Sequence, residues 1–150
     1  MKKYRVLILV LVLTVLTVAL AVVHLTTRDS VEKGTIEIEY GGEAYTIDIS
    51  ELEYEQVSGI RINGKGEEKT VEALGILVSD VLKGEGIEEY ANVTVISDDS
   101  YSAQLTAEEI TEETRAYLTV DEEKEGLRLI VFEDKDSKRS VQNVAHIVVE

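Results

Sequence analysis

The chain has 150 residues, enough for one domain of ordinary size, and it contains no cysteine, which excludes disulfides, thiolate metal sites and a cysteine nucleophile. Residues 1–28 carry four basic groups and no acid, so residues 29–150 hold 11 basic and 30 acidic groups and a net charge of −19. Such a polyanion repels nucleic acid and anionic lipid headgroups, so neither is expected as a direct ligand. The acidity either maintains solubility alone or attracts cations and basic partners.

The N-terminal segment is the most apolar part of the chain. Residues 6–27 are 22 consecutive residues without a formal charge. As a helix they would extend about 33 Å, which matches a hydrocarbon core of about 30 Å. Three basic residues within the first five precede this stretch, and positive charge before a span favours a cytoplasmic N-terminus. The sequence therefore predicts a single-pass protein of the cell membrane, with its C-terminal domain outside the cytoplasm.

A cleaved signal peptide is the alternative reading of the same segment. Ala19-Leu20-Ala21 is a small-x-small site at the end of the apolar run, and cleavage there would give a secreted protein. Against cleavage, the apolar run continues through Val22 and Val23. Residues 1–28 are thus expected to be a membrane anchor or signal segment, residues 29–34 a polar linker, and residues 35–150 an extracytoplasmic domain.

A β-hairpin is expected at the start of this domain, over residues 35–49. Apolar and polar residues alternate there on both sides of Gly41-Gly42, a pair that permits a tight turn with positive φ. A two-residue turn would place Ile38 opposite Tyr45, so that both apolar sets share one face.

The rest of the domain combines strands with short helices. Apolar spacing predicts a helix over residues 75–84, and the capping box Thr106-Ala107-Glu108-Glu109 predicts the start of another. Residues 63–66 read as a loop and residues 98–100 as a turn. The pattern predicts an α+β domain built on a mixed β-sheet. Further strands are expected over residues 57–62, 93–96, 101–105, 117–120, 127–132 and 141–149.

Few residues suggest chemistry. His146 lies in the last expected strand, where a lone histidine is typically structural or surface-exposed. Asp134-x-Asp136 resembles the start of a calcium loop, but Arg139 and Ala145 occupy the positions that need Gly and Glu. The remaining acidic clusters are typical of solvated turns and helix faces. We therefore predict no catalytic residue and no metal site.

Four blocks of residues together resemble a known family. In order and spacing they are similar to the pterin-binding domain of the molybdopterin-dependent oxidoreductases of the sulfite oxidase type. This resemblance covers about half the chain and implies the fold of that domain. The blocks are Gly75–Leu82 with Gly86-Ile87, Val93–Ser102 with Leu105, Leu127–Val131, and Val141–Ile147.

The chain departs from the family where its chemistry resides. Family enzymes bind molybdenum through a cysteine on the loop before the Gly75 block, and the corresponding residues 60–66 contain none. The usual Asp-Gly-Tyr after the central strand is here Asp99-Ser100-Tyr101. The resemblance implies a cleft for a ligand or a protein partner. The candidate residues of this cleft are Asn63, Gly64, Asp98, Asp99 and Tyr101.

The sequence thus predicts a membrane-tethered, extracytoplasmic binding or accessory domain without catalytic activity and without a bound cofactor. One alternative is a redox subunit that holds a pterin, such as molybdopterin, or a flavin together with a partner. Another is an acidic module that binds cations.

Overall fold

The computed structural model describes residues 12–19, 34–121 and 126–150, and the chain divides into the units Met1–Ser30 and Val31–Glu150. In the first unit residues 12–19 are α-helical, and the Thr17 hydroxyl donates a hydrogen bond to the Leu13 carbonyl (2.8 Å). Within the described ranges, no helix has both the length and the apolar character needed to cross a membrane. Most of the predicted span 6–27, the possible cleavage site after Ala21, and residues 29–33 of the linker lie outside the described residues.

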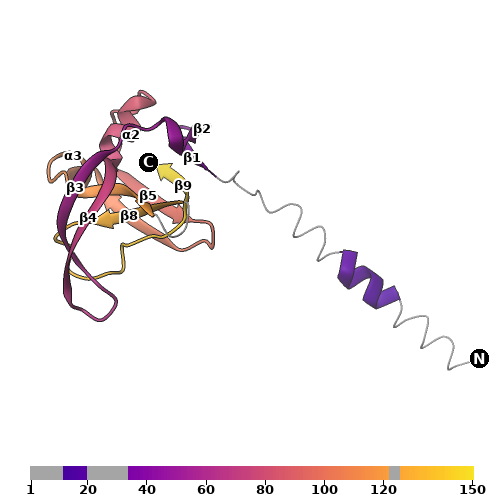
Figure 1. The fold of residues 1–150 in the computed structure, drawn as a ribbon. Helices are drawn as coiled ribbons and strands as arrows, with labels where there is room; N and C mark the ends of the chain where they lie inside the picture. Colours follow the sequence, from indigo (N-terminus) through magenta and orange to yellow (C-terminus); the bar gives the residue numbers. More distant parts are fainter. Residues whose placement is uncertain (1–11, 20–33, 122–125) are drawn as a thin grey trace, which may run out of the picture. The chain divides into compact units, whose positions relative to one another are not determined.

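The second unit contains two β-sheets and short helices (Figure 1). The five-stranded sheet has the order β2-β1-β9-β5-β6, and the four-stranded sheet the order β3-β4-β7-β8. Strands β1 and β9 are parallel while the other pairs are antiparallel, so the domain is α+β with a mixed sheet, as predicted. The elements are β1 (Thr35–Tyr40), β2 (Glu43–Asp48), η1 (Ile49–Glu51), β3 (Glu55–Ile62), β4 (Glu68–Leu77), α2 (Val78–Gly84), β5 (Asn92–Ser97), β6 (Ser102–Thr106), α3 (Ala107–Thr111), β7 (Ala116–Asp121), β8 (Gly126–Val131) and β9 (Val144–Val149).

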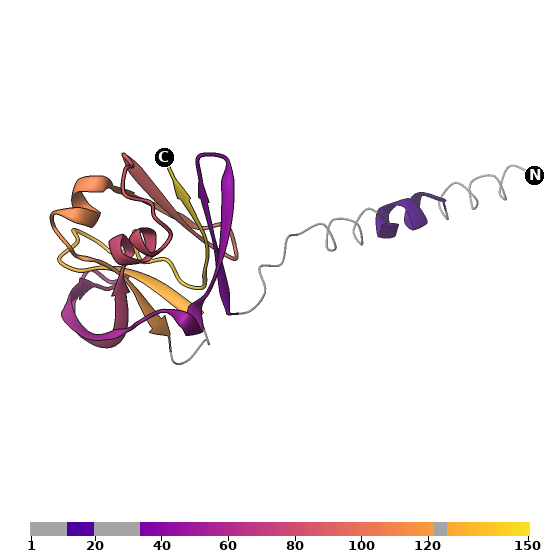
Figure 2. The ribbon, with the colours of Figure 1, turned by 90° about the horizontal axis from the view of Figure 1, so that it is seen from above.

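The first hairpin has the predicted register. Ile38 pairs with Tyr45, and both turn glycines, Gly41 and Gly42, have positive φ (61° and 84°). These angles suit the two-residue turn that matches the twist of the strands. Figure 2 shows the hairpin beside the C-terminal strand β9, to which β1 is hydrogen-bonded.

The expected helix over residues 75–84 begins later than predicted. Gly75–Leu77 belong to the end of β4, where they pair with β7, and α2 starts at Val78. The apolar spacing at these three positions is compatible with a helix and with a strand. They form a strand because they pair with β7. The rest of β4, residues 68–74, was not predicted to be a strand.

The last expected strand, over residues 141–149, is also shorter than predicted. Val141 forms a single bridge to Leu129 in the four-stranded sheet, whereas β9 begins at Val144 in the five-stranded sheet. Between them Asn143 has a positive φ of 49°. The chain therefore changes sheets here, and a continuous strand could not make this change.

One apolar core joins the two sheets and the helices. Alternate residues of β1, β5 and β9 are buried, and they pack with residues of α2, α3, β7 and β8. Because the buried side chains come from every layer, the core stabilises both sheets together. The largest fully buried side chains include Ile36, Ile38, Leu82, Ile87, Leu105, Ile110, Leu118, Leu127, Leu129 and Ile147.

The four-stranded sheet is curled so that its edge strand β3 meets the segment after β8. The Glu133 amide donates to the Ile60 carbonyl (2.8 Å). Beside this bond, a Cβ atom added to Gly59 would lie 2.9 Å from Cε1 of Phe132 and closer still to two other ring atoms. Phe132 is buried and packs against Tyr117 with ring centroids 5.5 Å apart. Gly59 is therefore needed for β3 to approach this ring.

We expect Gly59→Ala to lower the free energy of unfolding by about 1–3 kcal/mol, because the added methyl group overlaps a buried ring. Gly64→Ala is the matched control, since its Cβ would meet nothing within 4 Å. Urea denaturation measures both. If Phe132→Leu does not reduce the cost of Gly59→Ala in a double-mutant cycle, the ring is not the cause.

Candidate functional site

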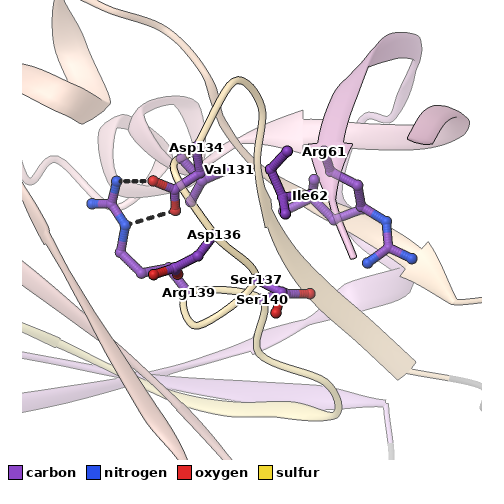
Figure 3. A pocket seen from close by; sticks show the side chains of 9 residues that line it. Arg61, Ile62, Val131, Asp134, Asp136, Ser137, Arg139 and Ser140 are labelled. Carbon is purple, nitrogen blue, oxygen red and sulfur yellow. Dashed lines mark hydrogen bonds and ion pairs between the residues drawn. The ribbon is translucent and has the colours of Figure 1, made fainter. Parts of the chain in front are cut away.

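A hollow lies between the end of β3, the end of β8 and the loop 132–143 that leads to β9 (Figure 3). Its space is about 210 Å³, open solvent included. Sites for drug-sized ligands usually have about 300–1,000 Å³. The hollow is therefore small for an organic cofactor. Its lining residues are Arg61, Ile62, Ile130, Val131, Asp134, Asp136, Ser137, Arg139 and Ser140.

Arg139 holds the loop through two carboxylates. Its Nε and Nη2 donate to Asp134 at 2.9 and 2.8 Å, a two-pronged pair that Figure 3 shows, and its Nη1 donates to Glu109 at 2.6 Å. Arg115, the residue immediately before β7, also donates to Glu109 (3.1 Å). Paired guanidinium and carboxylate groups of this geometry form strong hydrogen bonds. We call Glu109, Arg115, Asp134 and Arg139 the ion network.

Glu109 serves a second purpose in α3. The Thr106 amide donates to its carboxylate (3.0 Å), and the Glu109 amide donates to the Thr106 hydroxyl (3.3 Å), which confirms the predicted capping box. One side chain thus caps α3 and binds two arginines. The capping pattern was visible in the sequence, whereas the arginine partners were not.

The acids of the ion network have pKa values below the ordinary range. Partial burial raises the pKa of Glu109, but hydrogen bonds from Thr106 and Arg139 and the charges of Arg139 and Arg115 outweigh it. Burial also raises the pKa of Asp134, and Arg139 together with the Lys135 amide lowers it further than burial raises it. Both carboxylates are therefore held in the charged form.

The predicted cleft residues do not line this hollow. Asn63 is engaged in its own turn: its Oδ1 accepts from the Lys65 and Glu67 amides, and its Nδ2 donates to the Glu67 carboxylate. Gly64 lies in the same exposed turn between β3 and β4. Neither residue lines this hollow, because the turn extends past the end of β3, and a cleft at these residues stays a prediction.

The second predicted group, at residues 98–101, is also engaged internally. Asp99 accepts from the Ser97 hydroxyl and from the Tyr101 amide (3.1 Å), and these bonds lower its pKa. The Tyr101 hydroxyl donates to the Lys138 carbonyl, and the Asp98 amide donates to the Asn143 carbonyl (3.0 Å). This turn therefore supports the loop 132–143 from outside. In the described part of the chain, no hydrogen bond or ion pair joins it to the Asn63 turn.

The residues present do not fit a molybdenum-bound pterin. The chain has no thiol to bind the metal. The side chains of Asn63 and Asp99 are bonded within their own turns, the Tyr101 hydroxyl is bonded to the Lys138 carbonyl, and the hollow is small. Across the described ranges, no three carboxylate, imidazole or thiol groups gather as a metal site would require.

His146 lies on β9 opposite Glu37 of β1, and its Nδ1 is 3.6 Å from the Glu37 carboxylate. Its side chain is partly exposed on the sheet surface and lies outside the hollow. This position agrees with the prediction of a structural or surface histidine.

The chain matches no protein-family model, and no curated protein matches it significantly.

We expect Arg139→Gln to lower the free energy of unfolding by about 2–3 kcal/mol, because it leaves two partly buried carboxylates without their main partner. Lys138→Gln is the matched control: its side chain is 84% exposed and makes one surface pair, so a change within about 0.5 kcal/mol is expected. Urea denaturation at neutral pH compares them. Equal effects of the two substitutions would refute the stabilising role of the network.

The ion network also predicts a pH dependence. Because the folded pKa values of Glu109 and Asp134 are lowered, their contribution is complete above the unfolded values near 4 and is lost as pH falls through the folded values. The stability difference between the wild type and Arg139→Gln should therefore be constant above about pH 5 and shrink toward pH 2. Protonation of the other carboxylates at low pH relieves charge repulsion in both proteins, so this effect cancels in the difference between them. A difference that does not change with pH would contradict the assignment.

Proposed function

We propose that residues 35–150 form a noncatalytic binding or accessory domain, held on the outer face of the cytoplasmic membrane by residues 6–27. Support for the location comes from the sequence: 22 uncharged residues, with positive charge before them and a strongly acidic domain after them. Residues 12–19, the described part of this stretch, are helical with exposed side chains, which is compatible with a lipid-facing helix.

The noncatalytic reading rests on one observation above all: three carboxylates at the hollow and the predicted cleft are bonded to groups of the protein itself. Asp134 and Glu109 are paired with Arg139, and Asp99 is bonded within its turn. A general acid or base needs a proton-accepting or proton-donating group within reach of the substrate and a pKa near the working pH. Carboxylates held in the charged form below the ordinary pKa range lack the second property.

The resemblance to the pterin-binding domain supports a domain that has the fold of that family and lacks the cysteine that binds molybdenum. Ser100 has a φ of 71°, a conformation that favours glycine, and it occupies the position of the glycine in the family's Asp-Gly-Tyr pattern. The turn geometry is thus compatible with the resemblance. The net charge of −19 favours a basic partner.

We expect the full chain, with a C-terminal tag, to remain in the membrane after alkaline extraction and to lose the tag when protease is added to intact spheroplasts. A protected tag would contradict the proposed orientation. Replacing Lys2, Lys3 and Arg5 by Gln should increase the protected fraction, whereas replacing Lys65, Lys69 and Lys83 by Gln should not. A mature N-terminus at Val22 would overturn the anchor and leave export standing.

The noncatalytic assignment has a separate test. The full chain purified from its native host in a mild detergent should show no absorbance above 300 nm and no stoichiometric molybdenum. A bound pterin, flavin or molybdenum would refute the assignment, independently of where the domain lies.

A further inference from the structure

Arg61 is a cation without a counter-ion in the described part of the chain. It lies near the end of β3, on the same side of the strand as Val57 and Gly59, and its side chain is half-buried. Its Nε is fully buried and has no hydrogen-bond partner, and no described carboxylate pairs with its guanidinium. In a domain with 30 acidic groups, an unpaired and partly buried arginine is unexpected, because burial penalises a charge that nothing compensates.

The acids nearest to Arg61 have other partners. Asp134 and Asp136 line the same hollow, but Asp134 is bound by Arg139, and Asp136 accepts from the Lys138 amide (2.8 Å). Figure 3 shows the Arg61 guanidinium pointing away from the Asp134 carboxylate. Neither carboxylate therefore pairs with the terminal nitrogens of Arg61, which can donate hydrogen bonds to another group.

A second arginine lies close to the first. Partial burial lowers the pKa of Arg61, and the positive charge of Arg128 on β8 lowers it further. Arg128 has one carboxylate near it, Asp121 at 3.5 Å, and its Nε is also buried without a hydrogen bond. The curl of the four-stranded sheet brings β3, which carries Arg61, against the segment that follows β8, the strand of Arg128. Gly59, on the Arg61 side of β3, lies against Phe132 of that segment. Like charges at close range destabilise the fold unless an anion lies between them.

We propose that Arg61 and Arg128 form a binding site for a small oxyanion, either a carboxylate or a phosphate group. A guanidinium presents its donors in a planar fork that matches two oxygens of such a group, and two forks can bind one anion together. The anion supplies the negative charge that the described residues do not place beside Arg61. The surrounding negative charge of the domain repels anions at long range, so recognition depends on these two side chains at contact distance. The site does not depend on membrane attachment.

The test uses the full chain in a nonionic detergent and measures the melting temperature with sodium phosphate, sodium succinate or sodium chloride at equal ionic strength. Phosphate stabilises most proteins by exclusion from their surface, so the response of the wild type is compared with that of Arg61→Gln. We expect phosphate or succinate to raise the melting temperature of the wild type by about 3–5 °C more than that of Arg61→Gln, with saturation. The anion that gives the larger saturable shift identifies the group.

Two further variants sharpen the comparison. Lys65→Gln removes one positive charge from the exposed turn after β3 and should respond to the anion as the wild type does. Arg61→Lys keeps the charge without the planar fork and should show an intermediate response. In chloride, Arg61→Gln should be at least as stable as the wild type, because it removes a repulsion.

Two results would overturn the proposal. If the wild type and Arg61→Gln respond equally to phosphate and to succinate, the anions act only by exclusion. If Arg61→Gln is less stable than the wild type in chloride and shows no smaller anion response, Arg61 already has a counter-ion within the chain.

Discussion

The contact between β3 and the segment after β8 determines how this domain is put together. The Glu133 amide bonds to the Ile60 carbonyl, and beside this bond the Phe132 ring occupies the space that a side chain at position 59 would need. A glycine at position 59 permits the contact, and the contact closes the curl of the four-stranded sheet. Without it, the long β3–β4 hairpin would have only β7 and the core to hold it.

The position of the loop 132–143 follows from this closure. The loop starts at the contact, runs along the end of β3, and returns through the Val141–Leu129 bridge into the other sheet. Arg139 fixes its middle by binding Asp134 within the loop and Glu109 on α3. The hollow thus lies between the closed sheet and a loop that ion pairs hold in place. Its acidic groups have partners within the protein because they fix this loop.

The same closure bears on Arg61, a cation without a counter-ion among the described residues. Arg61 and Arg128 come from strands at opposite edges of the sheet, and the curl brings β3 to the segment that follows β8. In the hollow, Asp134 is bound by Arg139 and Asp136 accepts from the Lys138 amide, so neither carboxylate pairs with Arg61. Excess negative charge in the composition therefore does not imply that every cation is neutralised.

The sequence by itself determined the structures that depend on neighbours within a few residues. The Gly41-Gly42 hairpin with its register and the capping box of α3 were predicted because alternation, turn conformation and capping hydrogen bonds are local. Most strands were predicted within a few residues for the same reason. For a binding site, the sequence singled out two turns at residues 63–66 and 98–101; both are turns in the structure, and neither lines the hollow.

Only the tertiary structure decided what joins distant segments. Gly75–Leu77 are strand because β7 pairs with them, and Val141 is separated from β9 because it bridges to Leu129. Arg139 and Glu109 are 30 residues apart, and no local pattern indicates their pairing. The approach of β3 to Phe132 likewise depends on the curl of a whole sheet. Local energies are encoded in short stretches of sequence, whereas these contacts exist only after the chain has closed its core, which is why the hollow and its arginines could not be predicted.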